Sequence, residues 1–341
     1  YTMQKDSFSK FKTLINKSNQ ITIVTHYNPD GDAIGSSLAL YNYLIKLNKF
    51  VTVITPNQYP EFLHWLPGNK KVVEYNYNVK KTNALIAKSD LIFTLDFNNY
   101  SRLEGLGEAI KNSSAKKVLI DHHQQPDNYA TLYFHDVKAS STCELIHEFI
   151  CGLGGKKLID KNIASCIYTG IMTDTGSFRF DSVTVQTHLI LAHLIETGIK
   201  PNEIHSNIYD TFTESRMKLL GHCLTKKMVV LPEYQTAYIS LSESELKEFS
   251  YQKGDTEGIV NYPFGIKGIK FCAFFSEGDG IIKISLRSKG TFDVNQFARK
   301  HFNGGGHINA AGGKGNHNNL QKTVDEFLSL LPDYQKTILK K

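Results

Sequence analysis

The sequence predicts a two-domain α/β protein whose larger, N-terminal domain is a parallel sheet with helices on both faces. Short apolar runs typical of buried strands alternate with longer segments of helical apolar spacing through the first half of the chain. Beyond about residue 220 the pattern changes, with strands coming first and helices after them. We therefore expect a βαβ domain at 1–198, a helical linker at 199–220 and a smaller α/β domain at 221–341.

The individual elements follow from this periodicity. The expected strands of the first domain are 21–25, 51–55, 91–95 and 118–120. The expected helices are 33–47, 141–153, 162–172 and 185–197. Gly198 and Pro201 interrupt the pattern before a mostly helical connector at 201–220. In the second domain we expect strands at 235–241, 269–275 and 281–286, and helices at 294–301 and 320–331.

Composition is that of an ordinary soluble protein. Of 341 residues, 41% are hydrophobic and 21% charged, and no run approaches the roughly 18 apolar residues of a membrane span. The five cysteines are scattered without C-x-x-C spacing, as in a reducing cytoplasm. The net charge of +6 lies wholly after residue 215, where 18 Lys and Arg face 12 Asp and Glu. This surplus suits a polyanionic ligand, although a solvated surface explains it equally well.

Acidic residues and histidines follow the expected strands. The first strand is followed by His26, Asp30 and Asp32, and the 91–95 strand by Asp96. The 118–120 strand is followed by Asp121-His122-His123, and Asp174 lies where a helical run stops. Each of these has an ordinary explanation by itself, such as turn chemistry or a helix cap. Together they lie where ligands bind parallel sheets, beyond the carboxyl ends of the strands.

Such a cluster needs positive charge. The carboxylates of Asp30, Asp32, Asp96 and Asp174 would repel one another at one edge of a sheet unless they were protonated or neutralised. Two divalent cations would neutralise them. Because the donors are carboxylate oxygen and imidazole without thiolate, the set suits Mn²⁺ or Mg²⁺ better than structural zinc. Paired metal ions of this kind catalyse hydrolysis of phosphoesters and phosphoanhydrides.

The chain resembles the DHH phosphoesterases. His26-x-x-x-Asp30-x-Asp32, Asp96, the triplet Asp121-His122-His123 and Asp174 match the four motifs of that family in order. The run Gly304-Gly305-Gly306-His307-Ile308-Asn309-Ala310-Ala311-Gly312 is similar to the GGGHxxAAG signature of the accompanying DHHA1 domain. Within the family the chain looks like the stand-alone NrnA-like oligoribonucleases. These degrade very short RNA and often dephosphorylate 3′-phosphoadenosine 5′-phosphate (pAp).

The resemblance implies roles for the residues of the first domain. His26 and Asp30 would hold one metal, Asp32, His122 and Asp174 the other, and Asp96 would bridge them. Asp121 would accept a hydrogen bond that orients an imidazole, and His123 would face the substrate, stabilising phosphoryl charge or assisting the leaving oxygen. One departure is that Phe97-Asn98 follows Asp96 where family members often have a small hydroxyl residue, so a hydrogen bond from that position is in doubt.

In the second domain, the glycines permit positive φ and close approach of main-chain N–H groups to an anion, and Ala-Ala-Gly allows tight helix packing. Arg287, one of five arginines, is a plausible phosphate fork at the end of a strand, next to Ser288. By resemblance, Arg287 and His307 would hold the substrate's phosphate across a cleft from the metals. The expected substrate-binding residues are His123, Arg287, Ser288, Gly304, Gly305, Gly306 and His307.

The expected function is therefore a cytoplasmic hydrolase that cleaves short single-stranded RNA to mononucleotides and dephosphorylates pAp, using two divalent cations. Mn²⁺ is favoured, with Mg²⁺ or Co²⁺ as alternatives, and the enzyme could be a homodimer without membrane association. A cyclic-dinucleotide (c-di-AMP or pApA) phosphodiesterase on the same scaffold stays open as an alternative. A soluble inorganic pyrophosphatase shares the metal motifs but would lack the GGGH domain. A non-catalytic RNA-binding protein would not need six metal ligands.

Overall fold

The protein is described by a computed structural model covering residues 4–252, 254–278 and 280–340. The chain forms two compact units, residues 1–211 and 212–341. The division lies within the stretch expected to be a helical linker. None of the described helices has both the length and the apolar character needed to cross a bilayer.

Unit 1 is built around a seven-stranded sheet in the order β1-β7-β6-β5-β2-β3-β4. Its strands are β1 (Gln4–Lys5), β2 (Gln20–Thr25), β3 (Phe50–Thr55), β4 (Val72–Glu74), β5 (Leu91–Leu95), β6 (Lys116–Asp121) and β7 (Leu132–His135). All neighbours pair in parallel except the edge strand β1, which is antiparallel to β7. The predicted parallel sheet is confirmed, and the structure adds β1, β4 and β7 to it.

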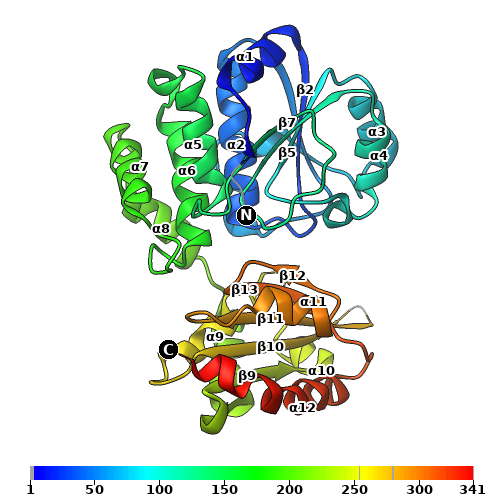
Figure 1. Ribbon diagram of the computed structural model, residues 1–341, viewed down its shortest axis with the longest axis vertical. Coiled ribbons are helices and arrows are strands. Elements are labelled where there is room, and N and C mark those ends of the chain that lie inside the picture. The colour runs from blue at the N-terminus through cyan, green and yellow to red at the C-terminus, as the bar shows by residue number, and fades with distance from the viewer. Residues whose placement is uncertain (1–3, 253, 279, 341) are drawn as a thin grey trace. The chain divides into compact units, whose positions relative to one another are not determined.

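Helices cover both faces of this sheet (Figure 1). They are α1 (Phe8–Lys17), α2 (Gly31–Lys46), α3 (Val79–Ala87), α4 (Leu106–Asn112), α5 (Thr142–Gly152), α6 (Lys161–Asp174), α7 (Val185–Glu196) and α8 (Pro201–Tyr209). Alternate strand residues face opposite layers, as the two-residue period of a strand requires. Ile23 and Phe93 belong to the core under α2 and α5, whereas Val24 and Ile92 belong to the core under α3 and α4.

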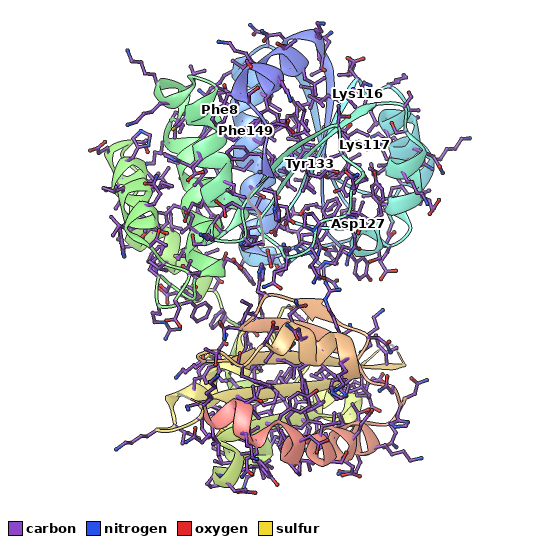
Figure 2. The ribbon with its side chains drawn as sticks, viewed as in Figure 1. Phe8, Lys116, Lys117, Asp127, Tyr133 and Phe149 are labelled. Atoms are coloured by element: carbon purple, nitrogen blue, oxygen red, sulfur yellow. The ribbon has the colours of Figure 1, made fainter. Side chains whose placement is uncertain are left out.

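Aromatic packing fixes α5 against the sheet. Phe149 of α5 is labelled in Figure 2. It lies edge-on to Phe11 of α1, with ring centroids 5.1 Å apart, and its ring centroid lies 5.5 Å from that of Phe134 of β7. Both Phe149 and Phe134 are almost fully buried. The buried rings therefore set where α5 begins, which matters because its first turn faces the candidate site described below.

Helices α2 and α6 approach each other closely through two glycines. A side chain at Gly35 of α2 would meet the carbonyl oxygen of Cys166 at 2.6 Å. A side chain at Gly170 of α6 would lie 2.9 Å from Oδ1 of Asp32 on α2 and would overlap the Sγ atom of Cys143 on α5. Because only glycine permits this approach, the first turn of α2 and the last turn of α6 come together, and with them Asp32 and Asp174.

Unit 2 contains a six-stranded mixed sheet in the order β12-β13-β11-β10-β9-β8. Its strands are β8 (Met228–Leu231), β9 (Thr236–Leu241), β10 (Phe271–Gly278), β11 (Ile281–Ser288), β12 (Gly305–Gly306) and β13 (Ala310–Lys314). Its α-helices are α9 (Glu214–His222), α10 (Glu243–Glu248), α11 (Val294–His301) and α12 (Leu320–Leu339). The α/β fold class predicted for both domains is confirmed.

Shorter helical turns connect these elements. They are the 3₁₀ turns η1 (Glu61–Leu63), η2 (Asn69–Lys71), η3 (Tyr100–Leu103), η4 (Lys156–Leu158), η6 (Pro232–Tyr234) and η7 (Ile259–Gly265), and the π-helical turn η5 (Cys223–Lys227).

The glycine-rich run forms strands. Ala310-Ala311-Gly312 belongs to β13, which pairs with β11 and with the glycines of β12. Ala311 also packs in one core with Phe297 and Ala298 of α11. A side chain at Gly304 would overlap the carbonyl oxygen of Gly312. The small residues therefore allow close approach of two strands.

Candidate metal centre

The first strand of the site ends in a helix cap. β2 ends at Thr25, and the next residue, His26, is 4% exposed. The Asp30 side chain caps α2 by accepting hydrogen bonds from the backbone N–H groups of Asp32 and Ala33 at 3.1 and 3.0 Å. Asp32 follows on the first helical turn and is 1% exposed. Asp30 is thus both the residue that caps the helix and a candidate metal ligand.

Asp96 lies directly after β5 in a strained conformation. Its φ is +64°, in the left-handed region that non-glycine residues rarely adopt, and its side chain is buried. Such a conformation costs on the order of 1 to 3 kcal/mol and concentrates at functional sites. It is held by a hydrogen bond from the Asp96 N–H to the carbonyl oxygen of Ile120 on β6, 3.2 Å away.

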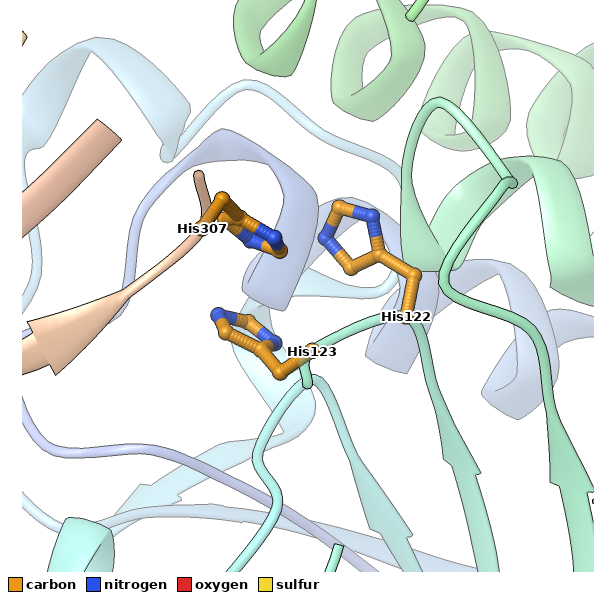
Figure 3. A group of neighbouring side chains, drawn as sticks. All are labelled: His122, His123 and His307. Carbon is orange, nitrogen blue, oxygen red and sulfur yellow. The ribbon is translucent and has the colours of Figure 1, made fainter. Parts of the chain in front are cut away.

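The two histidines of the triplet at the end of β6 have different hydrogen-bond partners. Asp121 is the last residue of the strand, and its Oδ1 accepts a 2.8 Å hydrogen bond from Nδ1 of His123. Nδ1 of His122 lies 3.2 Å from the carbonyl oxygen of Ala139. The two imidazoles lie 5.1 Å apart and almost perpendicular (Figure 3). Asp121 thus orients His123, not His122, which takes its orientation from a backbone carbonyl.

The structure brings the six residues expected to bind metal into two groups that share one region. His26, Asp30 and Asp96 form one group of neighbouring donor atoms, and Asp32, His122 and Asp174 form a second. Asp96 also reaches the second group, since its Oδ1 lies 3.6 Å from Nε2 of His122. Asp96, Asp121 and His123 form a further group.

Separations within the two groups fit shared ions better than direct hydrogen bonds. Nε2 of His26 lies 3.5 Å from Asp96 Oδ2 and 4.0 Å from Asp30 Oδ1. Nε2 of His122 lies 3.5 Å from Asp174 Oδ2 and 3.8 Å from Asp32 Oδ2. Hydrogen bonds need roughly 2.7 to 3.2 Å, whereas ligands each about 2.1 Å from one ion lie roughly 3 to 4 Å apart.

The tautomers also suit metal binding. Nδ1 of His26 lies 2.9 Å from the carbonyl oxygen of Tyr27, and that of His122 faces a carbonyl in the same way. A carbonyl can only accept, so each Nδ1 carries a proton, and Nε2, which faces the carboxylates, is the nitrogen left to bind a cation. The donors present therefore fit divalent cations.

Electrostatics shows that the cluster is short of positive charge. Burial, followed by the neighbouring Asp96 carboxylate, raises the pKa of Asp32 to about 8. Burial and the Asp30 carboxylate likewise raise the pKa of Asp96 well above its usual value. Burial opposes the charged form of His122, but Asp174 and Asp32 outweigh it and raise its pKa to about 9. Without cations, protons must therefore neutralise this region at neutral pH.

The comparisons with known proteins agree with this geometry. The model of the DHH family, N-terminal domain, matches residues 20–171, and that of the DHHA1 domain matches residues 233–336. The bifunctional oligoribonuclease and PAP phosphatase NrnA of Bacillus subtilis is 30% identical, over 86% of this chain and 88% of that protein. This chain belongs to the DHH family.

Two further relatives extend over most of this DHH protein. The bifunctional oligoribonuclease and PAP phosphatase NrnA of Thermus thermophilus is 30% identical over 86% of this chain and 83% of its own length. The crystal structure of an exopolyphosphatase-related protein from Bacteroides fragilis is 40% identical, with a TM-score of 0.93. It covers 98% of this chain and 97% of that chain. The family predicted from the motifs is confirmed.

Helix α5 supplies contacts that motif matching did not find. The N–H groups of Thr142 and Cys143 donate to the two carboxylate oxygens of Asp32 at 2.6 and 2.8 Å. Oγ1 of Thr142 donates to Asp96 Oδ1 at 2.9 Å. This hydroxyl gives Asp96 the hydrogen bond that buried Phe97 cannot give. The sequence Ser141-x-x-Glu144 is typical of a helix start, and Ser141 does cap α5. The sequence does not indicate which carboxylates the first turn of that helix faces.

In unit 2, Arg287 lies on β11 and His307 lies directly after β12. Both side chains are partly buried. Ser288 is 6% exposed, and its hydroxyl donates to the carbonyl oxygen of Phe292 at 2.7 Å. Its position is that of a residue holding the turn. Its hydroxyl is therefore already used within the fold of unit 2.

The glycine N–H groups expected to approach an anion are also partly used. That of Gly304 donates to the carbonyl oxygen of Ala298 at 3.2 Å, and that of Gly306 to Oδ1 of Asn295 at 2.9 Å. Asn295 is 1% exposed, so this bond is part of the fold of unit 2. The N–H groups of Gly304 and Gly306 are therefore already used within unit 2.

Proposed function

We propose that this protein is a divalent-metal-dependent phosphodiesterase that hydrolyses short oligoribonucleotides to mononucleotides and also dephosphorylates pAp. The observation that carries the proposal is the pair of His/Asp groups that both reach Asp96. The B. subtilis and T. thermophilus relatives named for both activities support the choice of substrates.

In this proposal, His26 and Asp30 hold one cation, Asp32, His122 and Asp174 hold the other, and Asp96 contacts both. Mn²⁺ is the favoured metal because the donors combine carboxylates with imidazoles and include no thiolate. When bound, such a pair of cations lowers the pKa of water and neutralises charge on a phosphoryl group.

The residues around these ligands have separate tasks. Asp121 holds the proton of His123 on Nδ1, so that Nε2 is the atom left to exchange a proton with the leaving oxygen. Burial is the main reason that the pKa of His123 is lowered to about 4, and an anionic phosphate nearby would raise it toward neutrality. Asp121 then stabilises the imidazolium that forms. For unit 2, the proposal keeps Arg287 and His307 as residues that bind a phosphate.

A substrate panel tests the proposal. A 5′-labelled dinucleotide, a trinucleotide, a 24-nucleotide RNA, pAp, pApA, c-di-AMP and polyphosphate would each be incubated with Mn²⁺, Mg²⁺, Co²⁺ or EDTA. We expect Mn²⁺-dependent turnover of the dinucleotide, the trinucleotide and pAp, and slow turnover of the 24-mer. A strong preference for c-di-AMP, or for polyphosphate, would replace the proposed substrate class.

The matched variants are Asp96→Asn, which changes a shared ligand, and Asp181→Asn, which changes an exposed aspartate in the turn before α7. We expect activity to disappear in the first and remain in the second. Full activity of Asp96→Asn, or no turnover of any substrate by the wild-type protein in Mn²⁺, would contradict the proposal and favour a non-catalytic RNA-binding role.

A further inference from the structure

We propose that Arg102 is a substrate-binding residue of unit 1 that contacts the oxygens of the scissile phosphate. The inference deepens the proposed function and rests on it. Arg102 belongs to η3, six residues after Asp96, and is not part of any motif discussed above. Its assignment would give the metal-binding unit a phosphate contact of its own.

The backbone of Arg102 is fixed next to the His26 strand end. Its carbonyl oxygen accepts a 2.7 Å hydrogen bond from the N–H of Tyr27, the residue that follows His26. Its own N–H donates to the carbonyl oxygen of Asn99 at 3.2 Å. Since Leu103 is fully buried next to it, Arg102 has little freedom to move away.

The same segment is fixed to the DHH triplet. Nδ2 of Asn98 donates to the carbonyl oxygen of Gln124 at 2.7 Å, and the carbonyl oxygen of Asn98 accepts from the N–H of Asp127 at 2.8 Å. Phe97, between Asp96 and Asn98, is fully buried. Segment 97–103 is therefore held between the loops that carry His26 and His122-His123, and a side chain projecting from it is pre-positioned.

The guanidinium acts on residues of both loops. After burial, its positive charge is the next largest cause of the lowered pKa of His26. It also disfavours the charged form of His123, where burial is again the largest cause. The Arg102 charge is therefore close to a proposed ligand of one metal and to the residue proposed to face the leaving oxygen.

This charge is not used by an ion pair. Among the residues that the structure describes, no carboxylate oxygen is recorded within 4.0 Å of the Arg102 guanidinium, although five aspartates lie in the surrounding groups. Arg102 is also only partly buried. A guanidinium fixed near two histidines, with no carboxylate pair, gains little for the fold, whereas it suits a bound phosphate.

A charge count supports an anionic ligand. The five aspartates of these groups, Asp30, Asp32, Asp96, Asp121 and Asp174, carry five negative charges, of which two divalent cations would balance four. Arg102 supplies the fifth positive charge, so that the loaded region does not repel a phosphodiester anion. Because negative charge on the equatorial oxygens must be held as the phosphoryl group is attacked, Arg102 should affect kcat as well as KM.

The experiment compares Arg102→Gln, Arg102→Lys and Lys111→Gln in the Mn²⁺-loaded full chain. Lys111 is exposed on the neighbouring helix α4, so its variant makes the same change in net charge away from the site. The readouts are kcat and KM for a labelled dinucleotide, the inhibition constant of inorganic phosphate, and bound Mn²⁺ per chain.

We expect Arg102→Gln to lower kcat/KM roughly 100-fold, as for loss of one preorganised donor, and to weaken phosphate inhibition roughly tenfold, with Mn²⁺ content unchanged. Arg102→Lys should recover part of both losses because it keeps the charge but not the fork. Lys111→Gln should resemble the wild-type protein.

Two results would overturn the inference. One is kcat/KM and phosphate inhibition in Arg102→Gln within twofold of wild type. The other is a loss of bound Mn²⁺ in Arg102→Gln with activity regained at saturating Mn²⁺, which would make Arg102 a support of the metal ligands. If the wild-type protein turns over none of the substrates, the proposed function fails. Calorimetric binding of inorganic phosphate to the Mn²⁺-loaded wild type and Arg102→Gln would then still decide the role of Arg102.

Discussion

Removing the metal should make unit 1 lose stability between pH 6.5 and 8, and Asp32→Asn should abolish much of that loss. The folded pKa of Asp32 is raised from 3.8 to about 8 and that of His122 from 6.5 to about 9. A group whose folded pKa is raised binds more protons in the folded state, so stability falls as pH rises between its two values. Between pH 6.5 and 8, Asp32 and His122 both lie between their unfolded and folded pKa values, so both contribute to the fall in stability.

Below pH 6.5, the titration of His123 opposes this fall in stability. The pKa of His123 is lowered from 6.5 to about 4, mainly by burial, and a group of this kind adds stability as pH rises between those values. That gain opposes the loss from Asp32 below pH 6.5. Above pH 6.5 His123 is neutral in the folded and the unfolded protein, so it no longer opposes the loss of stability from Asp32. The metal-free protein should therefore lose stability mainly on the neutral-to-alkaline side.

The expected loss in the free energy of unfolding follows from the width of this pH range. One proton changes the free energy of unfolding by about 1.4 kcal/mol per pH unit, so one to two protons over about 1.5 units give a loss of roughly 2 to 4 kcal/mol. Asn at position 32 carries no charge and can still accept a hydrogen bond from the first turn of α5. Since Asp32 also helps to raise the pKa of His122, the variant should remove at least half of the fall.

The assay uses Trp65, the single tryptophan, which packs against the core of unit 1 and so reports on that unit. Urea unfolding of the EDTA-treated protein would be followed by its fluorescence at several pH values, with Asp181→Asn as the control. The reasoning is refuted if the metal-free wild type is equally stable at pH 6.5 and 8, or if Asp32→Asn has the same pH slope as wild type. Adding Mn²⁺ should reverse the trend, because ligand deprotonation favours metal binding as pH rises.

Three further outcomes are expected. Asp96→Asn should reduce bound Mn²⁺, measured by mass spectrometry of the metal, below one ion per chain and lower kcat at least 1,000-fold; two bound ions would contradict a shared ligand. Thr142→Val removes the hydroxyl that donates to Asp96 and should cost about 1 to 2 kcal/mol of stability and roughly tenfold in kcat, whereas Thr142→Ser should retain both; unfolding and kinetic measurements that do not separate Val from Ser would refute this. Gly170→Ala should destabilise unit 1 by roughly 1 to 3 kcal/mol, because its Cβ overlaps Cys143 Sγ, while Gly221→Ala, with open space around its Cβ, should not; equal thermal stabilities would show that α5 and α6 can separate.

The fold and the metal-binding candidates were predictable because local signals pointed to the same place. β2, β5 and β6 are short runs of β-branched and apolar residues, and parallel strands deliver whatever follows them to one edge of a sheet. His26, Asp96 and His122 could therefore be grouped before any coordinates were known. Edge strands such as β1 and β12 were missed because two residues carry no periodicity.

Contacts between distant segments were not predictable. Thr142 reaches Asp96 because aromatic packing places α5, and Arg102 lies beside Tyr27 because of one backbone hydrogen bond. Neither contact leaves a pattern in the sequence, since each joins residues through space without constraining their spacing along the chain.

The sequence by itself determined which side chains follow the strands at the carboxyl edge of the sheet, because the strand runs and the helical segments between them are local patterns, and strands joined by helices pair in parallel. Only the tertiary structure decided that Asp121 orients His123 and not His122, that the glycine run forms strands, and that α5 donates to Asp32 and Asp96. These outcomes depend on distances of a few tenths of an ångström between elements, and such distances are set by how the buried side chains pack together.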